Sequence, residues 1–320
     1  MLPGSCRPKA ATPSPRAAML QGVSAEDTGA EAVPRNTCQS AGTKAKTRIT
    51  RPASNATRNG LFRTRFMGGA SMLEAMKTSL TLVTGGSRGL GLALVRQLLD
   101  RGDRVLTLAR RAPPLEHPAL IAWTVDLADP APAASRLAAW LGAQDPGMLA
   151  SVTLVNNAGV ISELAPLGEV GAADLSHALR VGLEAPMLLA SAFLRATASW
   201  QVPRKLLFVS SGLGRRAMAG SASYCAAKAG MDHLARAIAL EEAARPNGAR
   251  VVSLAPGVID TDMQVQLRSA DPTRFTDRGR FVGLHEGGML DSPETAAAKL
   301  LRYLDRADFG HQPVADVRDA

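Results

Sequence analysis

Three side chains in the second half of the chain have the types and spacing needed for proton transfer to a carbonyl group. Ser211 ends an apolar run, and Tyr224 and Lys228 stand four residues apart in a helical pattern. Residues four apart project from one helical face, so Tyr224 and Lys228 are expected to lie side by side. A carbonyl that accepts hydride develops negative charge on its oxygen and needs a positioned acid. Tyr224 would supply that proton, while Ser211 would hydrogen-bond the oxygen.

The acidity of Tyr224 decides whether this arrangement works near neutral pH. An ordinary tyrosine has a pKa of about 10, which is too high for easy proton exchange. A nearby ammonium favours the phenolate, so we expect Lys228, together with an oxidised nicotinamide, to lower the pKa of Tyr224. The chain has two tyrosines, and one of them stands in this group. The alternative hypothesis is that Tyr224 serves only as a packing residue.

A glycine-rich turn near the start of the apolar pattern is typical of a dinucleotide site. The run LTLVTGG leads directly into this turn, and a helical pattern follows it. Glycines allow a tight turn and a close approach to a pyrophosphate, and the helix N-terminus behind them presents free N–H groups. A strand before the turn and a helix after it strengthen the prediction. The expected cofactor contacts at the turn are Gly85, Ser87, Arg88, Gly89, Leu90 and Gly91.

Two arginines favour NADP(H) over NAD(H). Arg110 ends the second apolar run, where an NAD site usually has an acid that binds the ribose 2′-hydroxyl, about 20 residues beyond the turn. An arginine at that place accommodates a 2′-phosphate instead. Arg88 would bring a second guanidinium to the same phosphate, because planar guanidinium groups bind phosphate through two hydrogen bonds. The alternative is that both arginines are solvated surface residues.

Alternating apolar runs and helical patterns position these groups. Near-continuous apolar strands that alternate with helices indicate a parallel sheet buried on both faces. We therefore predict an α/β protein with a Rossmann-type doubly wound parallel sheet in a single domain. The expected strands are LTLVTGG, RVLTLAR, LIAWTVDL, SVTLVNNAG, KLLFVSSG and ARVVSLAPG. The expected helices are LGLALVRQLLDRG, residues 132–142, 172–181 and 184–198, the long helix that carries Tyr224, and residues 294–304.

Residues 1–75 differ in composition from residues 76–320. The first segment holds 11 Lys and Arg against 4 Asp and Glu, and the rest of the chain holds 26 against 24. It is rich in small and polar residues and shows no helical or strand period, so a disordered or over-extended N-terminal segment is expected. Its alternatives are a transit peptide, which Glu26, Asp27 and Glu31 argue against, and a basic arm for nucleic acid.

Composition excludes several classes of function. No apolar run approaches the ~18 residues of a spanning helix, so no membrane partner is expected. Aromatic residues make up 4% of the chain, which argues against a base-stacking surface for nucleic acid. Three cysteines without a CxxC pair and five histidines without ligand spacing predict no metal site. A reducing, cytoplasmic location fits this cysteine content best.

These motifs together resemble the short-chain dehydrogenase/reductase family across residues 78–320. The arginine pair, Arg88 and Arg110, and residues 255–301 further resemble its sepiapterin reductase and benzil reductase branch. The matching motifs are Thr84-Gly85-x-x-x-Gly89-x-Gly91, Asp126-Leu127, Asn156-Asn157-Ala158-Gly159, Ser211, Tyr224-x-x-x-Lys228 and Pro256-Gly257-x-Ile259-x-Thr261-x-Met263.

The resemblance implies an NADP(H)-dependent reductase of a small-molecule ketone or diketone that forms a homodimer or homotetramer. Its catalytic residues would be Ser211, Tyr224 and Lys228, with Lys228 also holding the nicotinamide ribose. A mobile substrate lid would span residues 262–290. The resemblance places Asp126 and Leu127 at the adenine, Asn157, Ala158 and Gly159 at the adenosine ribose, and Pro256, Gly257, Ile259 and Thr261 around the nicotinamide.

Two positions depart from the family pattern. Gly182 stands where the family has a helix asparagine that takes part in a proton relay. An alternative function is therefore a catalytically impaired, NADP(H)-binding regulatory protein of the same fold. The chain end also lacks the usual Gly-Gly finish, and Asp316 is either a counterpart of the acid that contacts substrate in sepiapterin-type enzymes or a surface acid.

Overall fold

The computed structural model describes residues 77–319, which form a seven-stranded parallel sheet covered by helices on both faces. The strand order is β3-β2-β1-β4-β5-β6-β7. The strands are β1 (Thr78–Thr84), β2 (Arg104–Ala109), β3 (Leu120–Thr124), β4 (Leu149–Asn156), β5 (Arg204–Val209), β6 (Arg250–Ala255) and β7 (Val314–Asp316). The sheet confirms the predicted doubly wound α/β fold. The predictions made for residues 1–75 lie outside the described residues.

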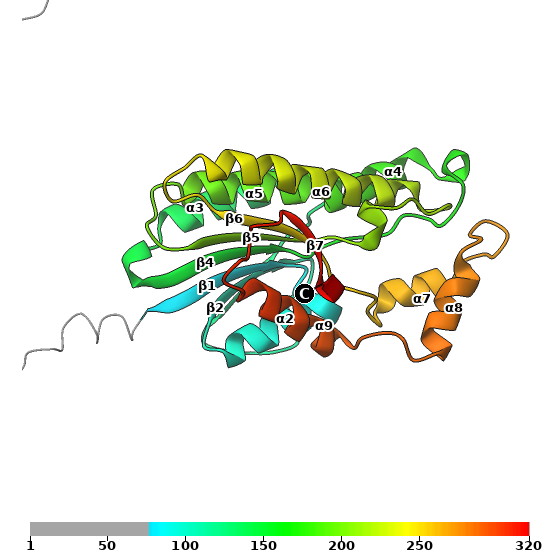
Figure 1. Ribbon diagram of the computed structural model, residues 1–320, viewed down its shortest axis with the longest axis horizontal. Coiled ribbons are helices and arrows are strands. Elements are labelled where there is room, and N and C mark those ends of the chain that lie inside the picture. Colours follow the sequence, from blue (N-terminus) through cyan, green and yellow to red (C-terminus); the bar gives the residue numbers. More distant parts are fainter. Residues whose placement is uncertain (1–76, 320) are drawn as a thin grey trace, which may run out of the picture. The chain divides into compact units, whose positions relative to one another are not determined.

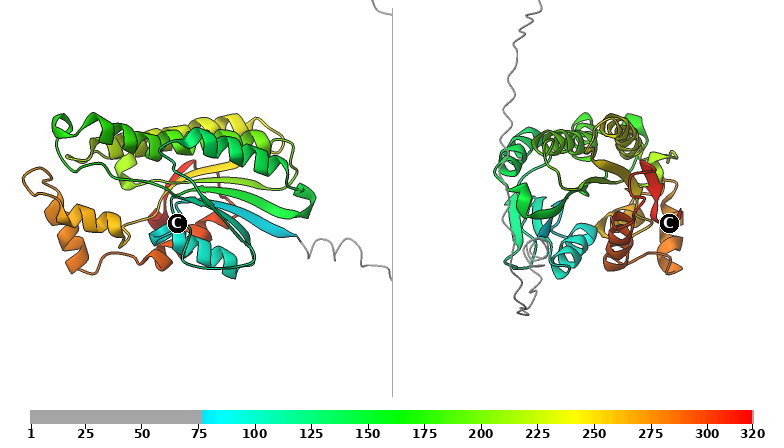
Figure 2. Two further views of the ribbon diagram at one scale, coloured as in Figure 1. Left: turned by 180° about the vertical axis from the view of Figure 1, so that it is seen from behind. Right: turned by 60° about the vertical axis from the view of Figure 1, so that its left-hand side comes forward.

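Helices cover the two faces of the sheet in separate layers (Figures 1 and 2). One face carries α3 (Pro130–Gly142), α4 (Ala172–Leu179), α5 (Ala185–Ala196) and α6 (Ala222–Ala243), and the other carries α2 (Gly89–Asp100) and α9 (Pro293–Leu304). Neighbouring strand residues point to opposite faces. Leu82 accordingly packs in the core under α3, α5 and α6, and Val83 packs in the core under α2 and α9.

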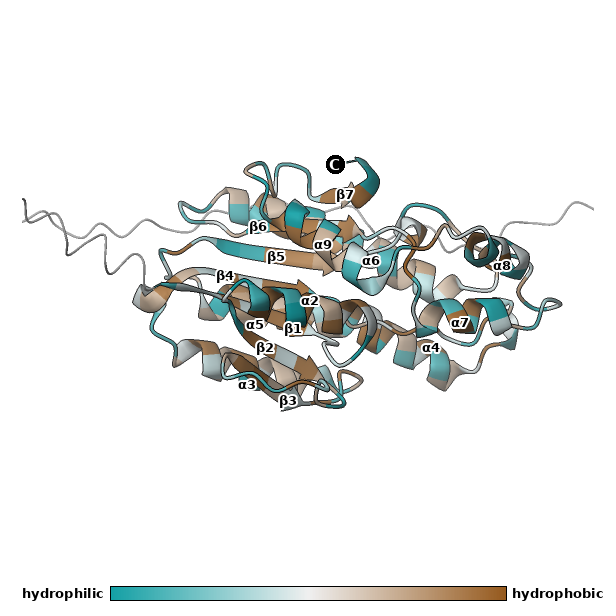
Figure 3. Ribbon diagram, turned by 90° about the horizontal axis from the view of Figure 1, so that it is seen from below, coloured by the Kyte–Doolittle hydropathy of each residue, from teal (hydrophilic) through white to brown (hydrophobic). Residues whose placement is uncertain are grey.

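The hydrophobic pattern explains why this sheet forms. The strands carry mainly hydrophobic residues along their length, as the colouring in Figure 3 shows. Parallel strands that are buried on both faces need this composition, since neither face meets water. β1 pairs with β2 on one side and β4 on the other, so the chain order reverses at β1. Such a reversal leaves a crevice at the carboxyl ends of the strands, which is where ligands bind in this class of fold.

Two features differ from the sequence expectation. The helices expected at 172–181 and 184–198 are one continuous helical segment, because a π-helical turn over Arg180–Glu184 joins α4 to α5 with helical backbone angles at both junctions. The short edge strand β7 was missed because three residues are too few to show an alternating pattern.

The segment between β6 and α9 forms two short helices beside the sheet. They are α7 (Asp262–Ser269) and α8 (Arg278–Glu286), which fall in the region expected to be a lid. They pack through a small hydrophobic cluster around Leu267 and Phe275, and Phe275 stacks on Phe281 with ring centres 5.8 Å apart. Within residues 77–319, no helix combines the length and apolar content needed to span a bilayer.

Candidate active site

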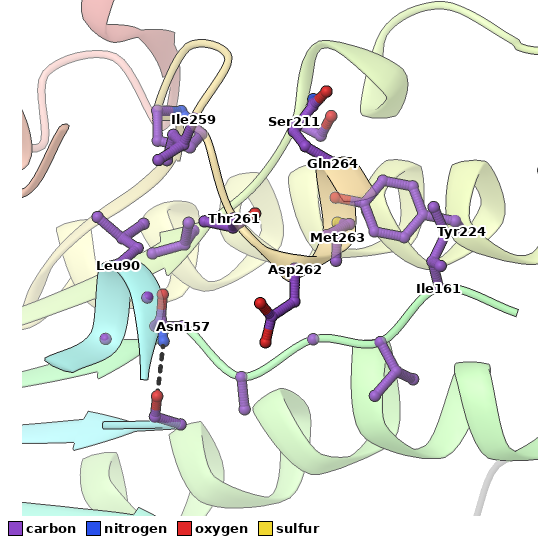
Figure 4. A pocket seen from close by; sticks show the side chains of 18 of the residues that line it. Leu90, Asn157, Ile161, Ser211, Tyr224, Ile259, Thr261, Asp262, Met263 and Gln264 are labelled. Atoms are coloured by element: carbon purple, nitrogen blue, oxygen red, sulfur yellow. Dashed lines mark hydrogen bonds between the residues drawn. The ribbon is translucent and has the colours of Figure 1, made fainter. Parts of the chain in front are cut away.

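One cavity of about 1060 Å³ lies at the carboxyl ends of the central strands. Every residue that the sequence proposed for catalysis or cofactor binding lines it, from the glycine turn at one end to Ser211 and Tyr224 at the other (Figure 4). The sheet topology therefore brings together segments that are separated by more than half of the described chain. A cavity of this volume can hold a dinucleotide together with a small substrate.

The glycine turn forms a cradle that side chains would fill. Gly85 and Gly89 have φ angles of 72° and 51°, a region that favours glycine. A Cβ atom on Gly91 would lie 2.1 Å from the Gly85 carbonyl oxygen, so this position requires glycine. Arg88 is the N-cap of α2 and makes no side-chain cap hydrogen bond. The donor set therefore fits a pyrophosphate, since the first residues of α2 line the cavity and the N-cap side chain does not bond to their N–H groups.

Thr84 and Asn157 fasten the cradle to the neighbouring strand. The Thr84 Oγ1 atom accepts hydrogen bonds from the N–H groups of Asn157 and Ala158, each at 2.9 Å. The Asn157 Nδ2 group donates back to the Thr84 carbonyl oxygen at 2.9 Å. Figure 4 shows Asn157 beside the glycine turn. These bonds hold the end of β1 against the end of β4. The sequence analysis had placed Thr84 in the glycine motif without giving it a role.

The two arginines proposed for the 2′-phosphate have different surroundings. Arg110 is exposed at the end of β2 and lines the cavity. Arg88 forms an ion pair with Asp262 at the start of α7, and both side chains are largely exposed. An exposed pair of this kind contributes only ~0–1 kcal/mol, so an arriving phosphate can compete with Asp262 for Arg88. No local pattern could indicate this partner, because 174 residues separate the two.

Ser211 and Tyr224 are held in place by local structure at the cavity. Ser211 follows β5, and its Oγ atom accepts a hydrogen bond from the Leu213 N–H at 3.2 Å. The Ser211 hydroxyl hydrogen is not used in this contact, and the hydroxyl also favours the Tyr224 phenolate. Tyr224 lies in the first turn of α6 and is 9% exposed. Figure 4 shows the Tyr224 ring reaching toward the same region as Ser211.

Lys228 is buried one turn farther along α6. Its Nζ atom lies 5.6 Å from the centre of the Tyr224 ring and donates a hydrogen bond to the Val209 carbonyl oxygen at 2.7 Å. Burial lowers the pKa of Lys228 to about 8, although the Asp232 carboxylate acts in the opposite direction. A buried ammonium loses hydration, and this loss favours the neutral amine.

The pKa of Tyr224 differs from the sequence expectation. Burial raises the pKa of Tyr224 to about 12, and the Ser211 hydroxyl offsets this effect only in part. The phenolate loses more hydration than the neutral phenol, which is why burial acts in this direction. Among the protein's own groups, burial therefore outweighs any lowering of this pKa, and the lowering expected from Lys228 together with an oxidised nicotinamide stays a prediction.

Asp232 is a buried carboxylate that the sequence analysis missed. It lies one turn beyond Lys228 on α6 and is 1% exposed. Its Oδ1 atom accepts hydrogen bonds from the hydroxyls of Ser210 and Ser253, both at 2.6 Å. Its Oδ2 atom has no hydrogen-bond partner among residues 77–319, and the nearest cation is Arg215 at 3.8 Å. The available signal was its position four residues after Lys228, which puts both side chains on one helical face.

Asp316 and Gly182, at the two positions that depart from the family pattern, are both buried. Asp316 is buried at the end of β7 and lines the cavity, so its reading as a surface acid is wrong. The Arg318 guanidinium donates two hydrogen bonds to it, at 2.7 and 2.8 Å, and the Arg318 backbone N–H donates a third at 3.0 Å. The guanidinium holds the pKa of Asp316 below its usual range. Gly182 lies buried in the π-helical turn, where an added Cβ atom would be 3.0 Å from the Ala227 Cβ atom.

Comparison with known proteins identifies the family. Residues 79–272 match the family model described as short chain dehydrogenase. The chain belongs to the short-chain dehydrogenase/reductase family. It is 31% identical over 239 residues to a benzil reductase, (S)-benzoin forming, of Bacillus cereus, a match that covers 71% of this chain and 94% of that protein.

Further relatives agree with the branch indicated by the sequence. The chain is 30% identical over 250 residues to the sepiapterin reductase of Rattus norvegicus, with 72% of this chain and 93% of that protein covered. The crystal structure of the KRED1-Pglu enzyme has 30% sequence identity and a TM-score of 0.63, and the match covers 73% of this chain and 99% of that one. The chain is therefore an oxidoreductase of this family, and its sequence is similar to those of benzil and sepiapterin reductases. Among residues 77–319, no cluster of three or more His, Cys, Asp or Glu has the arrangement of a metal site.

Proposed function

We propose that this protein is an NADPH-dependent reductase that converts a ketone or diketone carbonyl to an alcohol. The observation that carries the proposal is that Ser211, Tyr224 and Lys228 line the same cavity as the glycine turn. A proton donor and a dinucleotide cradle at opposite ends of one cavity suit hydride transfer to a carbonyl. Family membership and the benzil reductase relative support a reductase of this kind.

The cofactor assignment rests on the arginines and the glycine cradle. The α2 N-terminus would hold the pyrophosphate, and Arg110, with Arg88 once released from Asp262, would hold the 2′-phosphate. NADPH supplies a hydride when it is bound. The remaining proposed contacts are Asp126 and Leu127 at the adenine, Asn157, Ala158 and Gly159 at the adenosine ribose, and Pro256, Gly257, Ile259 and Thr261 at the nicotinamide.

Three side chains would carry out the proton chemistry. The Tyr224 hydroxyl gives its proton to the carbonyl oxygen of the substrate as that oxygen becomes an alkoxide. The Ser211 hydroxyl, whose oxygen already accepts from Leu213, donates a hydrogen bond to the same oxygen. Lys228, with its charge close to the Tyr224 ring, stabilises the phenolate that remains and contacts the nicotinamide ribose. Because Tyr224 and Lys228 are buried, water is kept away from this proton transfer.

The substrate, location and assembly follow as parts of this proposal. The relative named benzil reductase acts on an aromatic diketone, so a small-molecule carbonyl compound of this class is proposed here. Apolar side chains from the α7–α8 segment, among them Met263, Leu267 and Phe281, line the cavity and suit such a compound. We also place the protein in the cytoplasm and expect a homodimer or homotetramer.

The alternative function, a catalytically impaired regulator that binds NADP(H), rests on Gly182. Glycine lacks the side chain of the family's relay asparagine, but the π-helical turn that offers a main-chain carbonyl is present. The two functions differ in whether the purified protein turns over.

Turnover of benzil by the full chain tests the proposal. NADPH oxidation is measured with benzil for the parent and for Tyr224→Phe, which keeps the ring and removes the proton donor. We expect the parent to be active and kcat of the variant to fall by ~10²–10⁴-fold, the usual contribution of general acid–base catalysis. NADPH binding, followed by fluorescence, should be retained.

The cofactor preference is tested with Arg110→Asp in the same assay. The parent should have a higher kcat/KM with NADPH than with NADH, and the variant should lose or reverse this preference because a carboxylate repels the 2′-phosphate. Equal kcat/KM values for both cofactors in the parent would contradict the assignment of the arginines. An inert parent that binds NADPH would favour the regulator.

A further inference from the structure

Gln264 has an unusual environment for a polar side chain. It lies in the first turn of α7 and is 6% exposed. Its Oε1 atom is buried and has no hydrogen-bond partner among residues 77–319. A buried amide oxygen without a partner is unfavourable, because the hydrogen bonds it made to water are lost. Such a group calls for a partner that the described chain does not itself supply.

The neighbours of Gln264 place it over the catalytic side chains. Met263 and Leu267, which precede and follow it on the helix, pack in one hydrophobic cluster with Leu213 and Cys225. Leu213 comes two residues after Ser211, and Cys225 directly follows Tyr224. The helix face that carries Gln264 is therefore packed against the segments that carry Ser211 and Tyr224.

The same cavity contains all three groups. Gln264, Ser211 and Tyr224 line it, and Figure 4 draws the Gln264 side chain at the Ser211 end of the site. An amide offers a carbonyl acceptor and an N–H₂ donor, and rotation about its last bond exchanges the two. In the orientation described, the Oε1 atom would accept from the hydroxyl of an α-hydroxyketone. The second oxygen of a diketone only accepts, so it would bond to the Nε2 group once the amide has turned over. Ser211 and Tyr224 are reserved for the oxygen of the carbonyl that is reduced.

We propose that Gln264 is a specificity-determining residue that hydrogen-bonds a second oxygen of the substrate, on the carbon next to the reduced carbonyl. The inference rests on the proposed function and deepens it. It names 1,2-diketones and α-hydroxyketones as the substrates that the site selects over simple ketones. A ketone that lacks the second oxygen leaves the buried amide unpaired, and sites built around a hydrogen bond discriminate strongly against such analogues.

The experiment compares two substrates that share a carbon skeleton. Benzil carries the second oxygen, and deoxybenzoin (benzyl phenyl ketone) lacks it. The measured quantity is the ratio of kcat/KM for benzil to kcat/KM for deoxybenzoin, with NADPH, in the full chain. Comparing this ratio between variants cancels the intrinsic difference in reactivity between the two ketones. Circular dichroism and melting temperature verify that each variant is folded.

The variants remove the amide and keep the volume of the side chain. Gln264→Met has nearly the same length and shape, and Gln264→Leu provides a second apolar replacement. Gln266→Leu is the matched control, because Gln266 is an exposed glutamine on the same helix and does not line this cavity. We expect both Gln264 variants to reduce the ratio by about tenfold or more, through slower benzil reduction, while the control keeps the parent ratio.

The outcomes separate this inference from the proposed function. A parent that reduces neither ketone overturns the proposed function and the inference together. A parent that reduces benzil, with Gln264 variants whose ratio stays within about twofold of the parent value, overturns the inference alone. Weaker NADPH binding in the variants with an unchanged ratio would assign Gln264 to the cofactor and also overturn it. A reduced ratio with unchanged NADPH binding supports it.

Discussion

Burial acts in opposite directions on the pKa values of the two titratable groups at the proposed reaction centre. It raises the pKa of Tyr224 to about 12 and lowers that of Lys228 to about 8. Below pH 8, Tyr224 therefore holds the proton that reduction consumes, and Lys228 keeps the charge that stabilises the resulting phenolate. The first change on raising the pH is the loss of the Lys228 charge.

This order predicts a basic limb in the pH dependence of reduction. We expect kcat/KM for benzil to be level near neutral pH and to fall as pH rises through about 8, because Lys228 then becomes neutral while Tyr224 stays protonated. The measurement is kcat/KM with NADPH across the range, with circular dichroism at each pH as a control for unfolding. A profile that stays level well beyond the Lys228 pKa would show that the charge of this lysine is not needed.

Helix α6 is the element that aligns the site, and Asp232 attaches it to the sheet. The two serine hydroxyls that bond to Asp232 come from the end of β5 and from β6, and Ser210 directly precedes Ser211. One carboxylate therefore links the helix that carries Tyr224 and Lys228 to the segment that carries Ser211. The same carboxylate favours the charged form of Lys228.

Asp232→Asn should alter both functions of this carboxylate. We expect the basic limb to move to lower pH, because removing a negative charge near Lys228 lowers its pKa further. We also expect the free energy of unfolding to fall by about 1–3 kcal/mol, since the buried Ser210 and Ser253 hydroxyls lose their carboxylate acceptor. Glu241→Gln, which removes an exposed carboxylate from the same helix, is the control. An unshifted limb with lower stability would leave Asp232 a purely structural role.

The π-helical turn between α4 and α5 meets α6 at Gly182 and Ala227. A Cβ atom at position 182 would lie 3.0 Å from the Ala227 Cβ atom, so a side chain there requires α6 or the turn to shift by a few tenths of an ångström. Gly182→Asn is therefore expected to lower the melting temperature while changing kcat by less than about tenfold, equivalent to ~1.4 kcal/mol of barrier.

A double variant tests the origin of that change. Adding Ala227→Gly to Gly182→Asn removes the close contact. The double variant should therefore be destabilised by less than the sum of the destabilisations of the two single variants. Additive destabilisation would mean that the contact is not the cause. An inert parent that becomes active as Gly182→Asn would instead favour the regulator function.

At the scale of the whole molecule, the sheet and the cavity are built from residues 77–319. The first strand begins at Thr78, and both hydrophobic cores draw their residues from Leu80 onward. A chain that starts at Met76 is therefore expected to keep the melting temperature and the kcat/KM of the full chain. Thermal unfolding and benzil reduction of the two proteins provide the measurement. A clearly lower melting temperature of the shorter chain would show that residues 1–75 stabilise the domain.

The sequence by itself determined the features that arise from local patterns. The glycine turn, six of the seven strands and the pair Tyr224 and Lys228 were all visible because each depends on neighbours within about one helical turn or one strand. Alternation of apolar strands with helices was enough to predict the parallel sheet.

Only the tertiary structure decided the features that depend on segments far apart in the chain. The burial of Tyr224, which sets the direction of its pKa shift, comes from the packing around α6, and the ion pair of Arg88 comes from α7. Asp232 and Gln264 have ordinary sequence surroundings, and their significance follows from burial and from oxygen atoms without partners. The free energy of a charge or an amide depends on the water it loses, and loss of water is a property of the folded chain.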